Sequence, residues 1–444
     1  MRFEFPHPLA ILLIFIALAA VLTHVIPAGQ YDRITDETTG REVVVANSYQ
    51  EIDANPMGIF ETILKVPEGL IFGADIVVLI LIIGGAFVVV DKTGAFTDGI
   101  NALVTKFEHT QDRVIIVVGI TFATVGLLNN TFEEIIAMVP FLIVMGKRIG
   151  YSKTGVLAIS AGSAIIGASF SPMNPFAVLL AQKIAEVQPF SGTLFRMVVF
   201  IIVLSFWIYW VIKKGKSNEK IEIQTPDKDF KLPLRSAFIL ILVAITFSVM
   251  VYGILAWDWD YNQMSALFFV MGIVCGIIGK LGMNGTSRAY ATGFQELAFA
   301  AVVVGLARSI FLVLDEGKII DSIVYGLFNP LKDLPLAVSA VGMTVSQALL
   351  HIPVASNSGQ AVLTMPLLTP LSDLIGMSRQ VMILCYQYGA AMMDMISPTN
   401  GALLAMITAA GVSFKEWFSF CIKPFLIIMG ISLVAIFVAI FIGL

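Results

Sequence analysis

The sequence is poor in charge, cysteine and histidine. Three cysteines and four histidines occur in 444 residues, and 13% of the residues are charged. Cys275, Cys385 and Cys421 lie singly within apolar stretches, so they offer neither a disulfide framework nor the spacing of a metal site. The net charge of −4 is small, and no block of like charge resembles a nucleic-acid-binding arm. We therefore expect no nucleic-acid partner.

Apolar residues are what the sequence has in excess. They make up 58% of the chain, and the mean hydropathy is +0.90. This is more apolar surface than one soluble core could bury. The composition predicts an all-α polytopic protein of the lipid bilayer. Its first apolar stretch, residues 9–27, lacks a small-residue cleavage site and is interpreted as a transmembrane helix.

Two polar pentapeptides interrupt long apolar stretches. Ser171-Pro172-Met173-Asn174-Pro175 lies within residues 154–184, and Ser397-Pro398-Thr399-Asn400-Gly401 lies within residues 381–410. Proline lacks a backbone N–H and disfavours helical geometry in the preceding residue, so we expect each stretch to be a broken helix. Unpaired backbone groups are costly inside a bilayer and are tolerated where they line a cavity. The breaks therefore predict a binding site, as in secondary transporters.

A polar tip precedes each break, between apolar arms that are too short to span a bilayer confidently. We interpret each tip with its arms as a re-entrant hairpin. The hairpins cover about 114–146 and 337–375, and their tips are Asn129-Asn130-Thr131 and Ser356-Asn357-Ser358.

The spacing of tips and breaks repeats along the chain. The first tip precedes its break by 42 positions (129 to 171) and the second by 41 (356 to 397). A long internal period indicates a duplicated architecture. We predict one repeat in residues 1–213, a cytoplasmic linker in 214–235 and a second repeat in 236–444, with scaffold helices beside each hairpin and broken helix.

The distribution of basic residues predicts the orientation. Loops assigned to the cytoplasm hold 18 of the 27 lysines and arginines, as the positive-inside rule requires. This assignment makes the two repeats inverted, with nine full spans, a cytoplasmic N-terminus and an external C-terminus. The first hairpin then enters from the cytoplasm and the second from outside.

Inverted repeats with broken helices place a substrate near the middle of the membrane, where the tips and breaks should converge. We expect the tips to bind a substrate carboxylate and the breaks to contribute to substrate and coupling-ion binding. The alternative is that these side chains only cap half-helices. The candidate substrate residues are Asn129, Asn130, Thr131, Ser356, Asn357, Ser358, Ser171, Asn174, Ser397, Thr399 and Asn400, with Na⁺ near Asn130, Asn174, Asn357 and Asn400.

Charged residues within the apolar stretches are functional candidates. Glu133, Glu134 and Asp394 could bind Na⁺, a proton or a substrate ammonium, or they could form internal ion pairs or helix caps. Arg308 is expected in an internal ion pair, with anion recognition as the alternative. His351 is a weaker candidate, because a lone histidine is more often structural. Beyond a coupling ion, Na⁺ or H⁺, no cofactor is expected.

The paired tips and breaks, together with Pro-Ala-Gly-Gln-Tyr at 27–31, resemble the C4-dicarboxylate anaerobic carrier family and its YfcC-like branch of basic amino acid antiporters. The sequence is also similar to the wider ion-transporter superfamily. That resemblance implies a bacterial inner-membrane carrier, commonly a homodimer, with a scaffold and a transport domain that moves as an elevator. It also implies that the two tips are clamps and that 171–175 and 397–401 are unwound segments.

The three acidic residues near the expected site depart from the dicarboxylate carriers of the superfamily. Glu133, Glu134 and Asp394 would repel a dianion unless cations compensate. We therefore favour an amino acid, whose ammonium an acidic site attracts. A C4-dicarboxylate carried with Na⁺ or by exchange is the alternative.

Two other classes of protein fit less well. A channel would need a continuous polar stripe or a ring of like charges, and the sequence instead offers two closed hairpins. An intramembrane hydrolase could use Ser356, His351 and Asp394. Their order carries no nucleophile-elbow signature, however, and Ser356 falls on a repeated tip.

Overall fold

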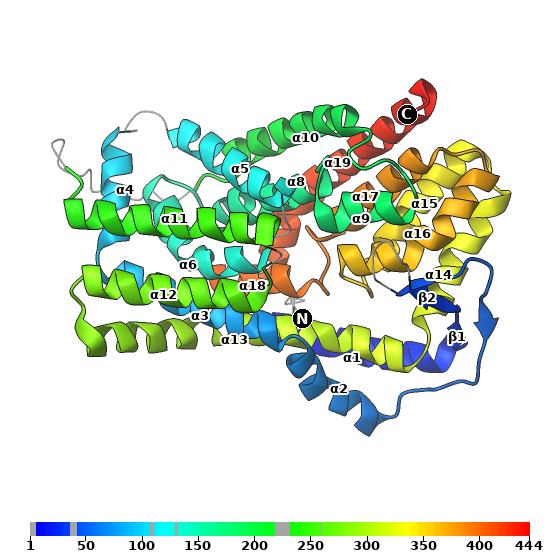
Figure 1. The fold of residues 1–444 in the computed structure, drawn as a ribbon, viewed down its shortest axis with the longest axis horizontal. Coiled ribbons are helices and arrows are strands. Elements are labelled where there is room, and N and C mark those ends of the chain that lie inside the picture. The colour runs from blue at the N-terminus through cyan, green and yellow to red at the C-terminus, as the bar shows by residue number, and fades with distance from the viewer. Residues whose placement is uncertain (1–5, 36–41, 107–110, 129–131, 218–230, 258) are drawn as a thin grey trace, which may run out of the picture.

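The computed structural model describes residues 6–35, 42–106, 111–128, 132–217, 231–257 and 259–444, and it is mostly helical (Figure 1). The helices of the first half are α1 (Pro8–Val25), α2 (Ile59–Phe72), α3 (Ala74–Lys92), α4 (Ala95–Lys106), α5 (Gln111–Leu128), α6 (Phe132–Arg148), α7 (Lys153–Leu157), α8 (Ser163–Ser169), α9 (Leu180–Ile184) and α10 (Thr193–Lys214). Two π-helical turns, η1 (Ala158–Gly162) and η2 (Pro175–Leu179), lie between α7 and α9.

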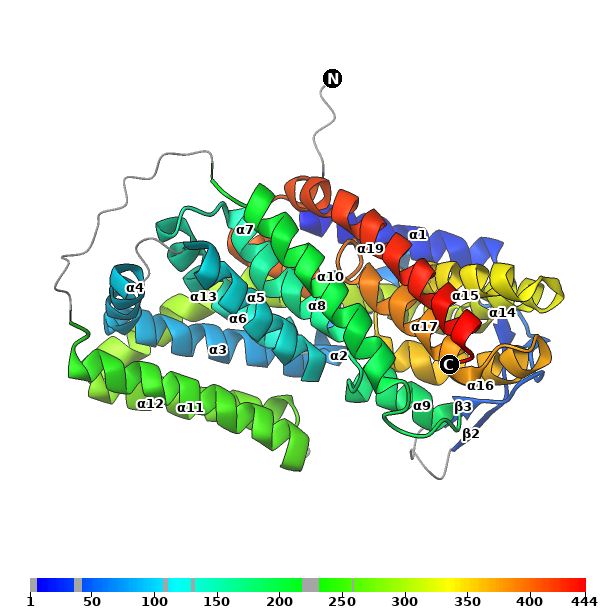
Figure 2. The same cartoon turned by 90° about the horizontal axis from the view of Figure 1, so that it is seen from above.

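The second half contains the longest helices. They are α11 (Leu234–Trp257), α12 (Tyr261–Ile278), α13 (Gly282–Glu316), α14 (Ile320–Phe328), α15 (Leu336–Leu350), α16 (Asn357–Leu374), α17 (Arg379–Met393), α18 (Gly401–Ala410) and α19 (Phe414–Ile442), with a 3-10 turn η3 (Asn329–Asp333). Figure 2 shows α11 and α12 on the opposite side of the molecule from α1 and α19.

Seven helices among the described residues are long and apolar enough to cross a membrane: α1, α3, α10, α11, α12, α13 and α19. The count of nine spans adds the two broken helices, α7 to α9 and α17 to α18, and it stays a prediction. The division into two repeats and a linker also stays a prediction, and residues 218–230 of that linker lie outside the described part of the chain.

Helix α13 is longer than the sequence indicated. The stretch around Arg288 is polar, as is typical of a loop, and the apolar residues begin at Leu297, but one helix runs through both for 35 residues. Packing stabilises it, because α13 lies against α1, α2, α3 and α18. Gly293 lets α13 approach α3 closely: a Cβ at this position would lie 2.6 Å from the Gly84 carbonyl oxygen. Small residues of this kind are typical of close helix contacts in membranes.

The expectation of an all-α chain is wrong in the segment after α1. Strand β1 (Gly29–Gln30) pairs with β4 (Gln50–Glu51), and β2 (Arg33–Thr35) pairs with β3 (Glu42–Val44), both antiparallel. Strand β3 packs against α16, and β1 packs against α14. This pair of short ribbons, which we call the external ribbon because its strands are largely exposed, lies at the end of the molecule that holds α14, α15 and α16 (Figure 1).

Both predicted breaks interrupt helices. Helix α8 ends at Ser169 and η2 begins at Pro175, while α17 ends at Met393 and α18 begins at Gly401. All side chains of α8 are buried, as are those from Gln380 to Met392 in α17. The breaks therefore expose backbone in the interior of the molecule, where each polar group requires a hydrogen-bonding partner.

Candidate functional site

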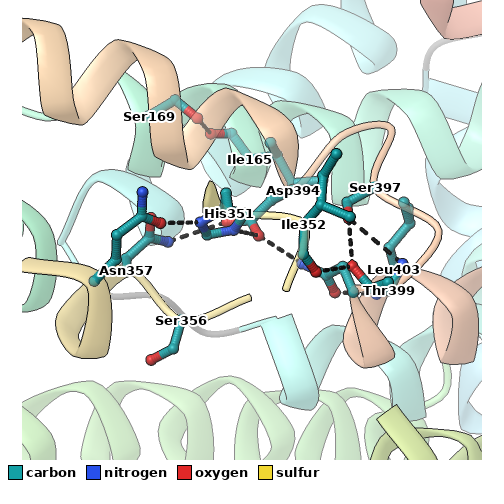
Figure 3. Close-up of polar contacts among 12 residues, drawn as sticks. Ile165, Ser169, His351, Ile352, Ser356, Asn357, Asp394, Ser397, Thr399 and Leu403 are labelled. Atoms are coloured by element: carbon teal, nitrogen blue, oxygen red, sulfur yellow. Dashed lines mark hydrogen bonds and ion pairs between the residues drawn. The ribbon is translucent and has the colours of Figure 1, made fainter. Parts of the chain in front are cut away.

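The tip of the second hairpin and the second break meet at the carboxylate of Asp394 (Figure 3). The Asn357 Nδ2 donates to Asp394 Oδ2 over 3.0 Å, and the Asn400 Nδ2 donates to Asp394 Oδ1 over 2.6 Å. Asp394 is 3% exposed. Hydrogen bonds to a charged group are each worth about 1.5–3 kcal/mol, so this carboxylate joins α16 to the start of α18.

His351 is the third partner of Asp394. It caps the end of α15, is fully buried, and its Nε2 lies 2.8 Å from Asp394 Oδ1. Its Nδ1 lies 2.8 Å from the Gln360 Oε1. Both ring nitrogens of His351 are thus hydrogen-bonded, as expected for a structural histidine. Because one of those bonds is to Asp394, however, His351 belongs to the same network as the tip.

Ser356 of the tip and Asn400 of the break also cap the helices that they begin. Ser356 is the N-cap of α16, with its Oγ accepting from the Gly359 N–H over 3.2 Å. Asn400 is the N-cap of α18, with its Oδ1 accepting from the Leu403 N–H over 2.8 Å. Capping of this kind satisfies the free N–H groups of a helix start. It also leaves the Asn400 amide nitrogen free to face Asp394.

The first break uses the same hydrogen bonds at the same offsets. In each break the serine Oγ accepts from the N–H two residues later, and the asparagine Oδ1 accepts from the N–H three residues later. Four residues correspond at a shift of 226: Ser171 and Ser397, Met173 and Thr399, Asn174 and Asn400, Ala177 and Leu403. This agreement supports the duplication inferred from the sequence.

The first break contacts other parts of the chain. Ser171 Oγ donates to the Leu127 carbonyl over 2.6 Å, and Asn174 Nδ2 donates to the Gly126 carbonyl over 3.3 Å, both near the end of α5. The Gln387 Nε2 of α17 donates to the Ser171 carbonyl over 2.7 Å. These bonds link the first break to both the first tip region and the second broken helix.

A buried arginine supports this link. Arg196 of α10 is fully buried, and its Nε donates to the Gln387 Oε1 over 3.0 Å. Its other nitrogens donate to the Gln380 Oε1 and the Ser191 carbonyl. Among the described side chains no carboxylate pairs with Arg196, so neutral acceptors alone solvate a buried cation, which makes each of them costly to remove.

A cavity of about 800 Å³ opens on the Asp394 network. Its lining residues come from the second tip, the second break, α13, α14 and the external ribbon. Arg308 of α13 lines it, with the Arg308 Cζ 5.7 Å from the centre of the Phe72 ring. The expected internal ion pair of Arg308 is not found among the described side chains, and its guanidinium lies instead over the Phe72 ring, which also lines the cavity.

One buried acceptor, on a residue that lines this cavity, lacks a partner. Asn357 is 7% exposed, and its Oδ1 makes no hydrogen bond to any described residue. The orientation of the Asn357 side-chain amide follows from its nitrogen, because only Nδ2 can donate to Asp394 Oδ2. A buried oxygen without a donor costs free energy of about 1–3 kcal/mol, so this position favours binding of a donor or a cation.

The part of the cavity that is lined by the external ribbon and α14 is charged. Arg33 of the external ribbon forms an ion pair of 2.9 Å with Asp321 of α14, and the Tyr31 N–H donates to the same carboxylate over 3.0 Å. Burial, with a further contribution from Asp321, raises the pKa of the Tyr31 hydroxyl above its ordinary value, so it stays neutral. The ion pair thus holds the ribbon against α14 at the cavity.

Residues 5–441 match the family of C4-dicarboxylate anaerobic carriers. The chain is 30% identical to the YfcC protein of Escherichia coli K12, whose name assigns it provisionally as a basic amino acid antiporter, over 94% of this chain and 92% of that protein. It is 26% identical to an uncharacterised protein of Haemophilus influenzae, over 94% and 93%.

The chain belongs to the C4-dicarboxylate anaerobic carrier family. It is a membrane transporter of that family and of its YfcC-like type, and the bacterial relatives with the seven apolar helices indicate an inner-membrane protein. The family and its relatives point to transport and not to catalysis.

Two solved transporter structures resemble the chain at low identity. They are Neisseria gonorrhoeae MtrF, of a class of antimetabolite efflux pumps (16% identity, 98% of this chain and 95% of that one, TM-score 0.43), and Alcanivorax borkumensis YdaH (15%, 99% and 99%, 0.45).

The structure brings together part of the predicted site of this carrier. Ser356, Asn357, Ser358, Thr399, Asn400 and Asp394 line the cavity. Ser397 is buried and lies 2.8 Å, Oγ to Oγ1, from Thr399, whose Oγ1 donates to the Ile352 carbonyl. Ser171 and Asn174 are buried at the first break and are not among the described lining residues.

Other predicted residues are placed less fully. Asn129, Asn130 and Thr131 lie outside the described residues, as does the side chain of Glu133. Glu134 is buried on α6, which packs against α3 and α18. The roles of these five residues, and Na⁺ binding at either tip, stay predictions.

Sequence reasoning missed two polar side chains that support the breaks. Gln387 and Arg196 were not singled out, although each is polar and lies in a strongly apolar stretch. That contrast is a usable signal, because polar side chains inside a membrane protein face its interior and tend to be paired. Their partners are far apart in the sequence, so the pairing itself was not visible.

Proposed function

We propose that this carrier is a secondary active transporter of a small carboxylate-bearing metabolite, with an amino acid favoured and a basic amino acid foremost. The observation that carries the proposal is the free Asn357 Oδ1 beside Asp394 in the cavity. A substrate ammonium is a donor and a cation, and it would satisfy the free oxygen and interact with the carboxylate.

The carboxylate of the substrate would bind Arg308. A guanidinium presents donors in a fixed fork that matches a carboxylate, and Arg308 has no ion-pair partner among the described side chains. Ser356 and Ser358 line the same cavity and supply hydroxyl donors from the tip. An amino acid could thus be held by groups of both signs.

Asp315, on the same helix as Arg308, would be the partner of a second positive charge on the substrate, as in a basic amino acid. Asp315 lies seven residues after Arg308 on α13, so both side chains share a helix face, about 10 Å apart along the axis. Phe311 lies between them on that face, and all three line the cavity. An aliphatic chain with an ionic group at each end would match this order of charge, apolar surface and opposite charge.

The alternative substrate is a C4-dicarboxylate, carried with Na⁺ or by exchange. The unpaired Arg308 favours it, as does the family to which the chain belongs. Asp394 and Asp315 weigh against it, because both would repel a second carboxylate unless cations compensate.

The proposed mechanism is ion-coupled or exchange transport by elevator-type alternating access. Helix α18 packs on α13 through small residues, which would allow one body to slide on the other: a Cβ at Gly401 would lie 2.9 Å from the Ala307 Cβ. We further propose a homodimer. We also propose a cytoplasmic N-terminus and an external C-terminus, in line with the charge distribution of the loops.

Uptake by proteoliposomes tests the proposal. The purified carrier is reconstituted and offered radiolabelled arginine, lysine, neutral amino acids and C4-dicarboxylates, with and without Na⁺ and pH gradients. We expect saturable uptake or exchange, strongest for the basic amino acids. Failure to move any carboxylate-bearing compound under any gradient, or single-channel currents, would contradict it.

A further inference from the structure

The hydrogen-bond network around His351 determines where its protons lie. The Gln360 Nε2 donates to the Gln347 carbonyl oxygen over 2.8 Å, and a carbonyl can only accept. The same nitrogen also donates to Gln347 Oε1. The Nε2 of Gln347 in turn donates to Thr364 Oγ1 over 3.0 Å. Both glutamine amides are therefore oriented unambiguously, with the Gln360 Oε1 toward His351.

Because Gln360 presents an oxygen, the Nδ1 of His351 must carry a hydrogen to form its 2.8 Å bond. The other ring nitrogen then faces Asp394 Oδ1 at 2.8 Å. Neutral imidazole has one N–H, so either the ring is doubly protonated and Asp394 is ionised, or the ring is neutral and Asp394 carries the proton. In both cases one proton lies between Nε2 and Oδ1.

Rotation of the Asp394 carboxylate does not remove the need for this proton, because both of its oxygens are held by other donors. The Asn400 Oδ1 is used by its helix cap, so its Nδ2 is the atom that donates to Asp394 Oδ1. The Asn357 Nδ2 holds the other oxygen. If the shared proton leaves, a nitrogen lone pair and a carboxylate oxygen face each other in a buried site, which costs free energy until a new cation or donor arrives.

We propose that the His351–Asp394 pair is the proton site of this carrier, and that a proton and the substrate ammonium occupy it alternately. Loss of the proton to the cavity leaves a net negative charge at Asp394, next to the free Asn357 Oδ1. An ammonium that binds there restores neutrality. Substrate and proton then compete for one carboxylate, which is the arrangement that proton-coupled antiport requires. The inference rests on the proposed function and names its coupling ion.

Other ionisable groups share the surroundings of the pair. Tyr386 of α17 donates its hydroxyl to the Asn357 carbonyl over 2.5 Å and so contacts the tip, not the pair. The remaining described charges of the cavity wall, farther along α13, on α14 and on the ribbon, are Arg308, Asp315, Lys318, Asp321, Arg33 and Glu42, and Glu134 is buried on α6. A test must therefore separate the pair from the other carboxylates.

Titration calorimetry of the purified wild-type carrier with arginine gives the first test. Measured in buffers of different ionisation enthalpy, it counts the protons that binding releases. At pH values where the pair is protonated, we expect about one proton released per arginine and an affinity that rises by up to about tenfold per pH unit, the limit for one linked proton. Binding that releases no proton at any pH tested, or that takes protons up, would overturn the inference.

Transport by an Asp394→Asn variant gives the second test, with Asp373→Asn as the matched control. Asp373 lies near the end of α16, pairs with Arg379 and is not among the cavity residues. We expect Asp394→Asn to lose arginine accumulation driven by a pH gradient, and Asp373→Asn to keep it.

The two tests separate failure of the inference from failure of the proposed function. Wild-type transport of arginine that ignores the pH gradient and follows Na⁺ would refute the proton site and leave the carrier proposal standing. Absence of any carboxylate transport by the wild type would refute both. If Asp394→Asn does not fold, the wild-type calorimetry still decides.

Discussion

Asn400 uses the two ends of its side chain for different purposes. Its Oδ1 caps α18, and its Nδ2 binds Asp394, so a capping role and a role in the site are compatible in one residue. Asn357 differs, because only its Nδ2 is bonded and its Oδ1 is left over. At the scale of single residues, the unused acceptor distinguishes a binding group from a structural one.

Substrate charge selection can be tested at Asp315. We expect Asp315→Asn to weaken transport of basic amino acids by about two- to fivefold relative to neutral ones, the range for an exposed ion pair. Glu316→Gln is the matched control, since the neighbouring Glu316 pairs with Lys65 and does not line the cavity. Competition uptake with arginine and leucine measures the ratio, and an unchanged ratio in Asp315→Asn would remove this residue from substrate selection.

At the scale of elements, the breaks were predictable because proline acts locally. Pro172, Pro175 and Pro398 stand beside serine and asparagine in apolar stretches, and this combination marks the breaks, since Pro140, Pro366 and Pro424 lie inside helices of the same chain. The length of α13 was not predictable, because its polar first turns resemble a loop and become helical through packing. The ribbon was missed because strands of two or three residues have no readable alternation.

Side-chain networks between elements were also beyond the sequence. Arg196 and Gln387 are 191 positions apart, and Gln387 and Ser171 are 216 apart. No local pattern connects them. The sequence grouped His351 with Asp394 only as residue types of a disfavoured hydrolase, and their hydrogen bond, across 43 positions, is seen only in the structure.

The contribution of Gln387, which links α10, α17 and the first break, to the free energy of unfolding can be measured. Gln387→Leu removes the acceptor of the buried Arg196 and the donor to the Ser171 carbonyl. We expect it to lower the free energy of unfolding by about 2–4 kcal/mol. Gln387→Glu, which keeps an acceptor for Arg196, should lose less. Thermal unfolding in detergent checks both, and a Gln387→Leu variant as stable as the wild type would contradict the assigned role.

At the scale of the whole molecule, the account depends on movement between two bodies. Helix α13 packs along α3, while α18 follows directly from the Asp394 network and also packs on α13. If the tips and breaks move as a unit, the contact between α18 and α13 must slide. A rigid molecule with the same contacts could bind a substrate but could not carry it across.

Cross-linking tests that movement. In a background without Cys275, Cys385 and Cys421, the substitutions Ala307→Cys and Gly401→Cys bring two sulfurs together, because these positions are in contact. We expect the reduced double variant to transport, oxidation to stop it, and a reductant to restore it, with each single variant insensitive to oxidant. Full transport by the oxidised protein would mean that these helices do not slide.

The central claim is that the cavity at the second tip and break holds the substrate, and equilibrium binding of radiolabelled arginine to Asn357→Ala tests it most directly. Asn329→Ala serves as the control, because Asn329 lies outside the cavity. We predict saturable binding by the wild type and the control. In Asn357→Ala, with unfolding temperature retained, we predict an affinity at least about tenfold weaker, as expected for loss of a hydrogen bond to a charged group. Wild-type affinity in a folded Asn357→Ala protein would contradict the account.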